Sequence, residues 1–206
     1  MDTELTFREI RYKEKRRKIL QNAARIFARK GYEKSSLKEI ADKLQLSKAS
    51  LYHYVKSKEE MLYLIQLDAI EEATENMEKV CNSDLNPQQK LYQAVTGHVK
   101  VVTKRHVVGA LRQQELILPK KWRDEIVSSR DRLEQLFHII IQEGVDAGLF
   151  VAKDVRISEL SILGILNGII RWYSPQGRLS VEEIGEAVAN FILRGYGLNP
   201  PTTNEN

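Results

Sequence analysis

Residues 36–58 decide the fold of this chain: Ser-Leu-Lys-Glu-Ile-Ala-Asp-Lys-Leu-Gln-Leu-Ser-Lys-Ala-Ser-Leu-Tyr-His-Tyr-Val-Lys-Ser-Lys. The stretch predicts two short amphipathic helices separated by a three-residue turn, and the second has a polar, basic outer face. In the first helix an apolar stripe with three–four spacing is formed by Leu37, Ile40, Ala41 and Leu44. The pattern is typical of a helix-turn-helix, whose second helix enters the DNA major groove.

The sequence on either side also predicts helices and shows no strand-type alternation. A first helix ends at Gly31, where a left-handed cap is expected, and Ser57 to Glu60 form a capping box that opens a long fourth helix. With the helix-turn-helix, the expected elements make about nine helices: 11–30, 36–44, 47–54, 57–80, 87–104, 106–117, 119–147, 155–173 and 180–196. We therefore expect an all-α protein with a three-helix DNA-binding head, residues 1–58, a linker helix from about residue 57, and a helical body, residues 59–206.

Charge is divided unequally between these two parts. Residues 1–58 hold 16 Lys/Arg and 7 Asp/Glu, a balance of +9, whereas residues 59–206 hold 16 and 21, a balance of −5. A basic head on an acidic body favours contact between one end of the molecule and phosphates. The basic run from Arg11 to Lys18 is expected to be a helix start or a loose arm on phosphates, or an ordinary solvated surface.

Composition excludes other classes of protein. No apolar run approaches the roughly 20 residues that a membrane span needs, and the first residues do not form a signal peptide. The one cysteine, Cys81, has no internal disulfide partner. These features favour a cytoplasmic protein with no membrane partner.

The second helix of the motif has several residues suited to DNA. Lys48 lies in the first turn, where a cation opposes the helix dipole, so a nearby phosphate or base would offset its cost. Small Ala49 and Ser50 allow close approach to base edges, and Tyr52 and His53 are expected to point outward. The alternative is that Tyr52, or more readily Tyr54, closes the small core of the head.

The motif and its surroundings closely resemble the tetracycline-repressor (TetR) family of bacterial regulators. The resemblance rests on Phe27, Gly31, Tyr32, residues 35–41 and residues 46–61. It implies an all-helical homodimer with one DNA-reading head per subunit and an effector pocket in the body. Carried over position by position, the implied DNA contacts are Ser36, Ser47, Lys48, Ala49, Ser50, Tyr52, His53 and Lys58.

Two residues depart from the family pattern. Gln45 occupies a turn position where the family often has Gly, and a positive φ there would impose modest strain. Val55 replaces a common Phe, which predicts a slightly smaller core beneath the second helix of the motif.

The last two helices are expected to form a dimer interface. The helix over 155–173 is apolar nearly all round, so it needs cover on both sides, and residues 180–196 add a second apolar face. We expect these helices to pair with their copies in a four-helix bundle, with Ser161, Gly164 and Gly168 allowing close approach. The alternative is a helix buried inside a monomer.

The expected effector site is less sharply defined. Three kinds of residue could line such a site: polar residues among apolar ones, aromatic residues that form walls, and arginines that bind an anionic head group. The candidates are His98, Arg112, Glu115, Trp122, Phe137, His138, Arg171 and Trp172. Each is also compatible with an ordinary core or surface role. Residues 167–180 resemble a segment of TetR-type regulators that respond to acyl-CoA thioesters, which favours an acyl-CoA effector.

The sequence thus predicts a ligand-responsive repressor that binds a palindromic operator on double-stranded DNA as a homodimer. We expect no enzyme activity, metal site or cofactor, because no nucleophile with a base, no metal-ligand spacing and no phosphate-binding glycine loop is present. The alternative is a DNA-binding interaction or chromosome-organising protein without a small-molecule effector.

Overall fold

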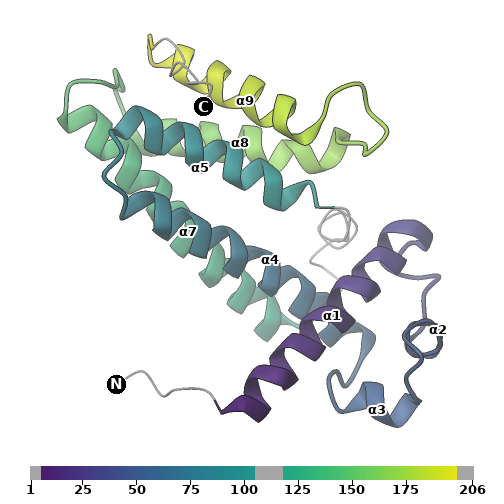
Figure 1. Ribbon diagram of the computed structural model, residues 1–206. Coiled ribbons are helices and arrows are strands. Elements are labelled where there is room, and N and C mark those ends of the chain that lie inside the picture. Colours follow the sequence, from purple (N-terminus) through teal and green to yellow (C-terminus); the bar gives the residue numbers. More distant parts are fainter. Residues whose placement is uncertain (1–5, 105–117, 199–206) are drawn as a thin grey trace. The chain divides into compact units, whose positions relative to one another are not determined.

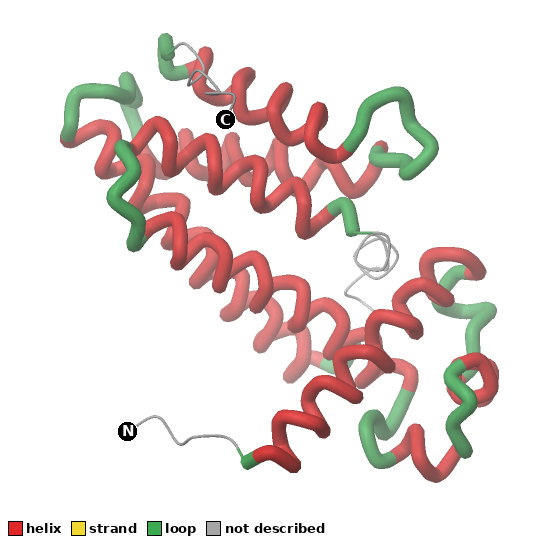
Figure 2. Tube along the Cα trace, in the orientation of Figure 1, coloured by secondary structure: helices red, strands yellow, loops and turns green. Residues whose placement is uncertain are grey.

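The structure is a computed structural model that describes residues 6–104 and 118–198. The described residues form helices and no strands (Figures 1 and 2). The helices are α1 (Phe7–Lys30), α2 (Leu37–Lys43), α3 (Lys48–Tyr52), α4 (Lys58–Cys81), α5 (Pro87–Val102), α7 (Lys120–Asp146), α8 (Val155–Trp172) and α9 (Val181–Gly195). The all-α prediction is confirmed, and the helix expected over 106–117 lies outside the described residues.

Two compact units divide the chain. Residues 6–67 and 118–123 belong to the first unit, and residues 68–104 and 124–198 to the second. The predicted limit of the head at residue 58 falls inside the first unit, because the opening turns of α4 share its core through buried Met61 and Leu62.

In the first unit, α1, α2 and α3 enclose a small apolar core. Phe27 of α1, Ile40 of α2 and Leu51 of α3 are almost completely buried there. Tyr32 packs edge-on against Phe27, with ring centroids 5.3 Å apart. Val55 is also buried, so a β-branched residue closes the core beneath α3. Burial of these side chains is the main stabilisation of so small a unit.

Helix α1 begins about one turn earlier than the predicted residue 11. Thr6 is its N-cap and forms a capping box with Glu9, whose carboxylate accepts a hydrogen bond from the Thr6 amide at 2.8 Å. Hydrogen bonds from Thr6 also lower the pKa of Glu9. The basic run 11–18 therefore belongs to a capped helix, which agrees with the expected helix start and not with a loose arm.

The second unit is built from the rest of α4 together with α5, α7, α8 and α9. Helix α5 packs along α9, where Gly185 lies against Thr96 (Figure 1). Lys90 of α5 pairs with Glu143 of α7 at 3.0 Å, and Arg132 of α7 pairs with Glu78 of α4. The apolar centre of this unit includes Phe137, Ile141 and Leu166.

No helix in the described part of the chain is both long and apolar enough to cross a membrane.

Candidate functional site

The turn between α2 and α3 has the tight geometry that a helix-turn-helix requires. Gln45 adopts a φ of 53°, in the left-handed region, and the Leu46 amide donates to the Ala41 carbonyl at 2.9 Å. The expectation that Gln replaces Gly at a strained turn position is thus confirmed. The turn sets the direction in which α3 leaves α2.

Two serines cap the helices of the motif. The Ser36 hydroxyl accepts a hydrogen bond from the Glu39 amide at 3.2 Å, at the start of α2. The Ser47 hydroxyl accepts from the Ser50 amide at 3.0 Å and also contacts the Ser50 hydroxyl at 2.8 Å. Both serines are exposed, so each N-terminus is formed and open to solvent.

The outer face of α3 is polar and exposed. Lys48, Ala49, Tyr52 and His53 are exposed, whereas Leu51 on the opposite face is completely buried. The Lys48 ammonium lies 5.7 Å from the centroid of the Tyr52 ring, which places the two side chains together. The alternative in which Tyr52 closes the core does not apply, since 42% of the residue is exposed.

Lys58 at the start of α4 has partners within the head. Its ammonium donates to the carbonyl oxygens of Tyr32 at 3.1 Å and Ser35 at 3.3 Å, and lies 4.1 Å from the centroid of the Tyr32 ring. Lys58 therefore joins α4 to the loop between α1 and α2. The expected contact between Lys58 and a phosphate remains a prediction. Because the ammonium already donates to two carbonyl oxygens, only part of its hydrogen-bonding capacity is left for a phosphate.

The second unit holds a pocket of about 400 Å³ between α4 and α5. Its lining includes Asn76 and Met77 from α4 and His98 and Lys100 from α5. His98 is 7% exposed, and neither ring nitrogen has a hydrogen-bond partner among the described residues. Burial lowers the pKa of His98 to about 4, so the imidazole is neutral at pH 7. An unpaired neutral imidazole offers one donor and one acceptor to a ligand.

Phe137 is a second predicted ligand residue that the structure brings to His98. The ring of Phe137 is buried, and the two ring centroids are 6.0 Å apart. Sequence reasoning did not single out Asn76, Met77 and Lys100, because their local sequence does not distinguish them from ordinary residues of an amphipathic helix.

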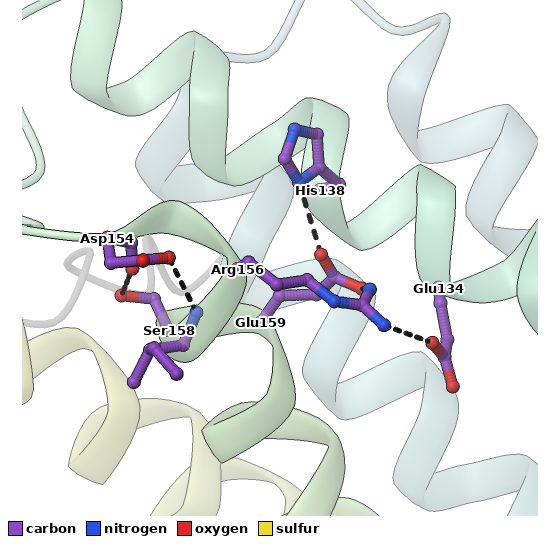
Figure 3. A network of polar contacts seen from close by, with 7 residues as sticks. Glu134, His138, Asp154, Arg156, Ser158 and Glu159 are labelled. Carbon is purple, nitrogen blue, oxygen red and sulfur yellow. Dashed lines mark hydrogen bonds and ion pairs between the residues drawn. The ribbon is translucent and has the colours of Figure 1, made fainter.

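His138 belongs to a separate polar network between α7 and α8 (Figure 3). Glu159 is completely buried, and its carboxylate contacts His138 at 3.1 Å and Arg156 through a short ion pair. Arg156 also reaches Glu134 at 3.4 Å. This network lines a second hollow of about 420 Å³ and ties α8 to α7.

The remaining predicted ligand residues have other surroundings or lie outside the described residues. Trp122 lies in the first unit, stacked on Tyr63 with ring centroids 5.2 Å apart. Arg171 and Trp172 are exposed at the end of α8, and Arg112 and Glu115 lie outside the described residues. Among the predicted residues that the structure describes in the second unit, His98 and Phe137 are in ring contact, whereas His138 pairs with Glu159, and Arg171 and Trp172 are exposed.

The helix-turn-helix with an open, serine-capped second helix defines a DNA-binding transcriptional regulator. A family model described as "Bacterial regulatory proteins, tetR family" matches residues 19–63, and one described as "Tetracyclin repressor-like, C-terminal domain" matches residues 84–196. The chain belongs to the TetR family.

Relatives agree with this assignment over nearly the whole chain. The chain is 28% identical over 187 residues to the HTH-type transcriptional repressor KstR2 of Mycolicibacterium smegmatis, covering 88% of this chain and 90% of the relative. It resembles the crystal structure of PfmR from Thermus thermophilus, with TM-score 0.76, 33% identity and coverages of 85% and 97%. It also resembles AibR in complex with isovaleryl coenzyme A and operator DNA, with TM-score 0.73, 26% identity and coverages of 90% and 98%.

Proposed function

We propose that this protein is a homodimeric repressor that binds a palindromic operator through α3 and leaves it when a small-molecule effector, an acyl-CoA thioester, binds the second unit. The observation that carries the effector part is His98, a buried side chain with two unpaired ring nitrogens at a pocket. An unpaired buried polar group costs roughly 1–3 kcal/mol, which a ligand can recover. The DNA part rests on the exposed residues of α3 together with Ser36 and Lys58.

The chemistry of the pocket suits a thioester. Neutral His98 can donate one hydrogen bond to a carbonyl oxygen, and Met77 and Ala94 supply apolar walls for an acyl chain. The exposed Lys100 adds a cation for a phosphate of the coenzyme. That the similar AibR is known with isovaleryl coenzyme A and operator DNA supports the same class of effector here.

An uncovered apolar face supports the dimer. Leu160 and Trp172 on α8 are 45% and 58% exposed, and Phe191 on α9 is 69% exposed. An ideal Cβ built on Gly164 or Gly168 meets no atom within 4 Å, so the described chain leaves the small-residue side of α8 open. Pairing α8 and α9 with their copies would bury these side chains and join two heads in one molecule. Two such heads could read the half-sites of a palindrome, which lie about 34–36 Å, one turn of DNA, apart.

Helix α4 could couple binding of the effector to release of the operator. This helix begins in the first unit and lines the effector pocket in the second. An effector that prefers a different tilt of α4 would change the separation of the two heads, and therefore the fit to a palindrome. The effector can shift the equilibrium only by its difference in affinity for the two states.

The test is a selection of bound duplexes from a random DNA library, followed by titration of the complex with candidate effectors. We expect one palindromic sequence, and release by isovaleryl-CoA or a longer acyl-CoA but not by coenzyme A alone. The variant His98→Phe should retain operator affinity and lose the response to the effector. Recovery of many unrelated sequences would instead favour a chromosome-organising protein, and release by none of the thioesters would remove the proposed effector class.

A further inference from the structure

The first three turns of α1 are helical although they contribute nothing to the core. No residue from Phe7 to Lys18 is buried, and the buried stripe of α1 begins at Ile19. An isolated helical segment of this length is marginal in water, so other interactions must hold it. The capping box of Thr6 and Glu9 secures one end.

Tyr12 attaches this exposed segment to the end of α3. Its hydroxyl donates to the His53 carbonyl at 3.1 Å, and its ring stacks on Tyr54 with centroids 5.1 Å apart. Tyr12 and His53 are 41 residues apart in sequence, so the contact is a tertiary one. It fixes the start of α1 beside the helix that reads DNA, and Figure 1 shows both at the same end of the first unit.

Four cations gather along one side of this segment. Arg8, Arg11, Lys15 and Lys18 are all exposed and follow the spacing i, i+3, i+7, i+10. At about 100° per residue they fall within an arc of about 80°. Tyr12 and Glu14 each lie about 40° outside this arc, on opposite sides, and Glu9 lies farther away. We call these four residues the α1 basic stripe.

The stripe has the dimensions and charge of a contact for the DNA backbone. The twelve residues of the segment span about 18 Å, the rise of about five base pairs. A row of cations tracks phosphates without reading bases, which positions a protein and strengthens its binding. We propose that the α1 basic stripe binds the phosphates that flank the sequence read by α3, and that Tyr12 is the positioning residue that holds it there.

The test rests on the DNA binding of the family and uses two duplexes. Both contain the palindrome selected from the random library, and one adds about ten base pairs, one helical turn, on each side. The wild-type protein should bind the longer duplex more tightly and with a steeper dependence on salt. The variant R8Q/R11Q/K15Q should bind both duplexes alike, with a salt slope on the longer one shallower by about three per head.

A matched control removes the same charge elsewhere. The variant K79Q/K153Q/R178Q neutralises three exposed cations of the second unit and should keep the full preference for the longer duplex. Equal affinity of the wild-type protein for the two duplexes would overturn the proposal. An equal loss of the preference for the longer duplex in R8Q/R11Q/K15Q and in K79Q/K153Q/R178Q would also overturn it. Failure of DNA binding itself is distinguishable, because the wild type would then bind neither duplex.

Variants of Tyr12 distinguish the effect of the position of the α1 basic stripe from the effect of its charge. Tyr12→Ala keeps all four cations and should lose most of the preference for flanking DNA, while Tyr12→Phe keeps the ring contact and should lose less. Circular dichroism of each variant reports whether the segment is still helical. If Tyr12→Ala retained the full preference for the longer duplex, the positioning role of Tyr12 would be wrong. If the α1 basic stripe bound anionic vesicles but not flanking DNA, DNA would be the wrong partner.

Discussion

At the scale of single residues, Lys48 is an exposed cation on the helix that we propose reads DNA. It occupies the first turn of α3, beside the N-cap Ser47, and its ammonium can approach an anion from solvent. A cation at a helix N-terminus weakens the helix by a few tenths of a kcal/mol. We therefore propose that Lys48 serves binding and not stability.

Lys48→Ala should weaken binding to the selected operator and reduce the salt slope by about one per head. Thermal unfolding should be unchanged or slightly improved, because the unfavourable charge is removed. Binding isotherms at several salt concentrations measure both the affinity and the slope. Lys79→Ala, which removes an exposed cation from α4, is the control, and an unchanged affinity of Lys48→Ala at fixed salt would contradict the placement of α3 on DNA.

His98 should make the stability of the fold sensitive to acid. Its pKa is about 4 in the folded protein and about 6.5 in the unfolded chain, so protons bind the unfolded state first as pH falls. Stability present above pH 6.5 is thus lost between about pH 6.5 and 4, by about 1.4 kcal/mol per pH unit at most. Denaturant unfolding at about pH 7 and pH 5 measures this loss.

The variant His98→Gln removes the titrating group and isolates its share of the acid sensitivity. We expect the unfolding free energy of the variant to fall by about 1.5 kcal/mol less between about pH 6.5 and 5 than that of the wild type. His138→Gln is a useful comparison, since that ring is half-exposed and paired with Glu159. An identical pH profile for wild type and His98→Gln would mean that the imidazole is accessible to protons in the folded state.

At the scale of elements, the residues that follow α7 and α9 pack against each other. Helix α7 stops near Gly148, whose φ of 68° turns the chain toward Phe150. Phe150 is buried and stacks on Tyr196 with ring centroids 4.7 Å apart, which attaches the end of α9. The ring fits only because Gly144 lacks a side chain: an ideal Cβ there would lie 2.2 Å from it.

Gly144→Ala should therefore displace Phe150 and lower the unfolding free energy by about 1–3 kcal/mol. Gly97→Ala is the matched control, because an ideal Cβ at Gly97 in α5 meets no atom within 4 Å. There alanine should stabilise the helix by up to about 1 kcal/mol. Denaturant unfolding of the two variants compares these opposite signs, and a neutral Gly144→Ala would show that Phe150 has room to shift.

Predictions from sequence succeeded best for elements with local signals. Gly31 ends α1 with a φ of 85°, and α9 begins after Ser180, as expected, with a capping box between Ser180 and Glu183. Both depend on residues within a few positions of each other, although Gly31 combines its positive φ with an extended ψ of 153° and so does not adopt the expected left-handed cap. The early start of α1 was missed because Thr6 and Glu9 precede the basic run that marked the helix, and Tyr12 finds its partner only in the folded head.

At the scale of the whole molecule, the proposed dimer can be tested without DNA. Phe191→Glu places a charge on the exposed apolar face of α9 and should convert a dimer into a monomer at micromolar concentration. The monomer should also lose most of its operator affinity, because one short helix contacts few bases. Sedimentation equilibrium measures the first effect, and Glu186→Gln on the same helix is the control. A wild-type protein that sediments as a monomer would refute the dimer.

The sequence by itself determined the class of this protein. Helical periodicity, serine caps and the turn around Gln45 are encoded within a few residues, because backbone hydrogen bonding and capping act over one or two turns. The segregation of charge is likewise visible without coordinates.

The tertiary structure decided which side chains meet. It brought Phe137 to His98, paired His138 with Glu159, and placed Lys58 on the carbonyl oxygens of Tyr32 and Ser35. Each of these pairs joins separate elements, and no helical period specifies which helix lies across from which. Burial and pairing are set by that packing, so a ligand site assembled from several helices cannot be read from spacing alone.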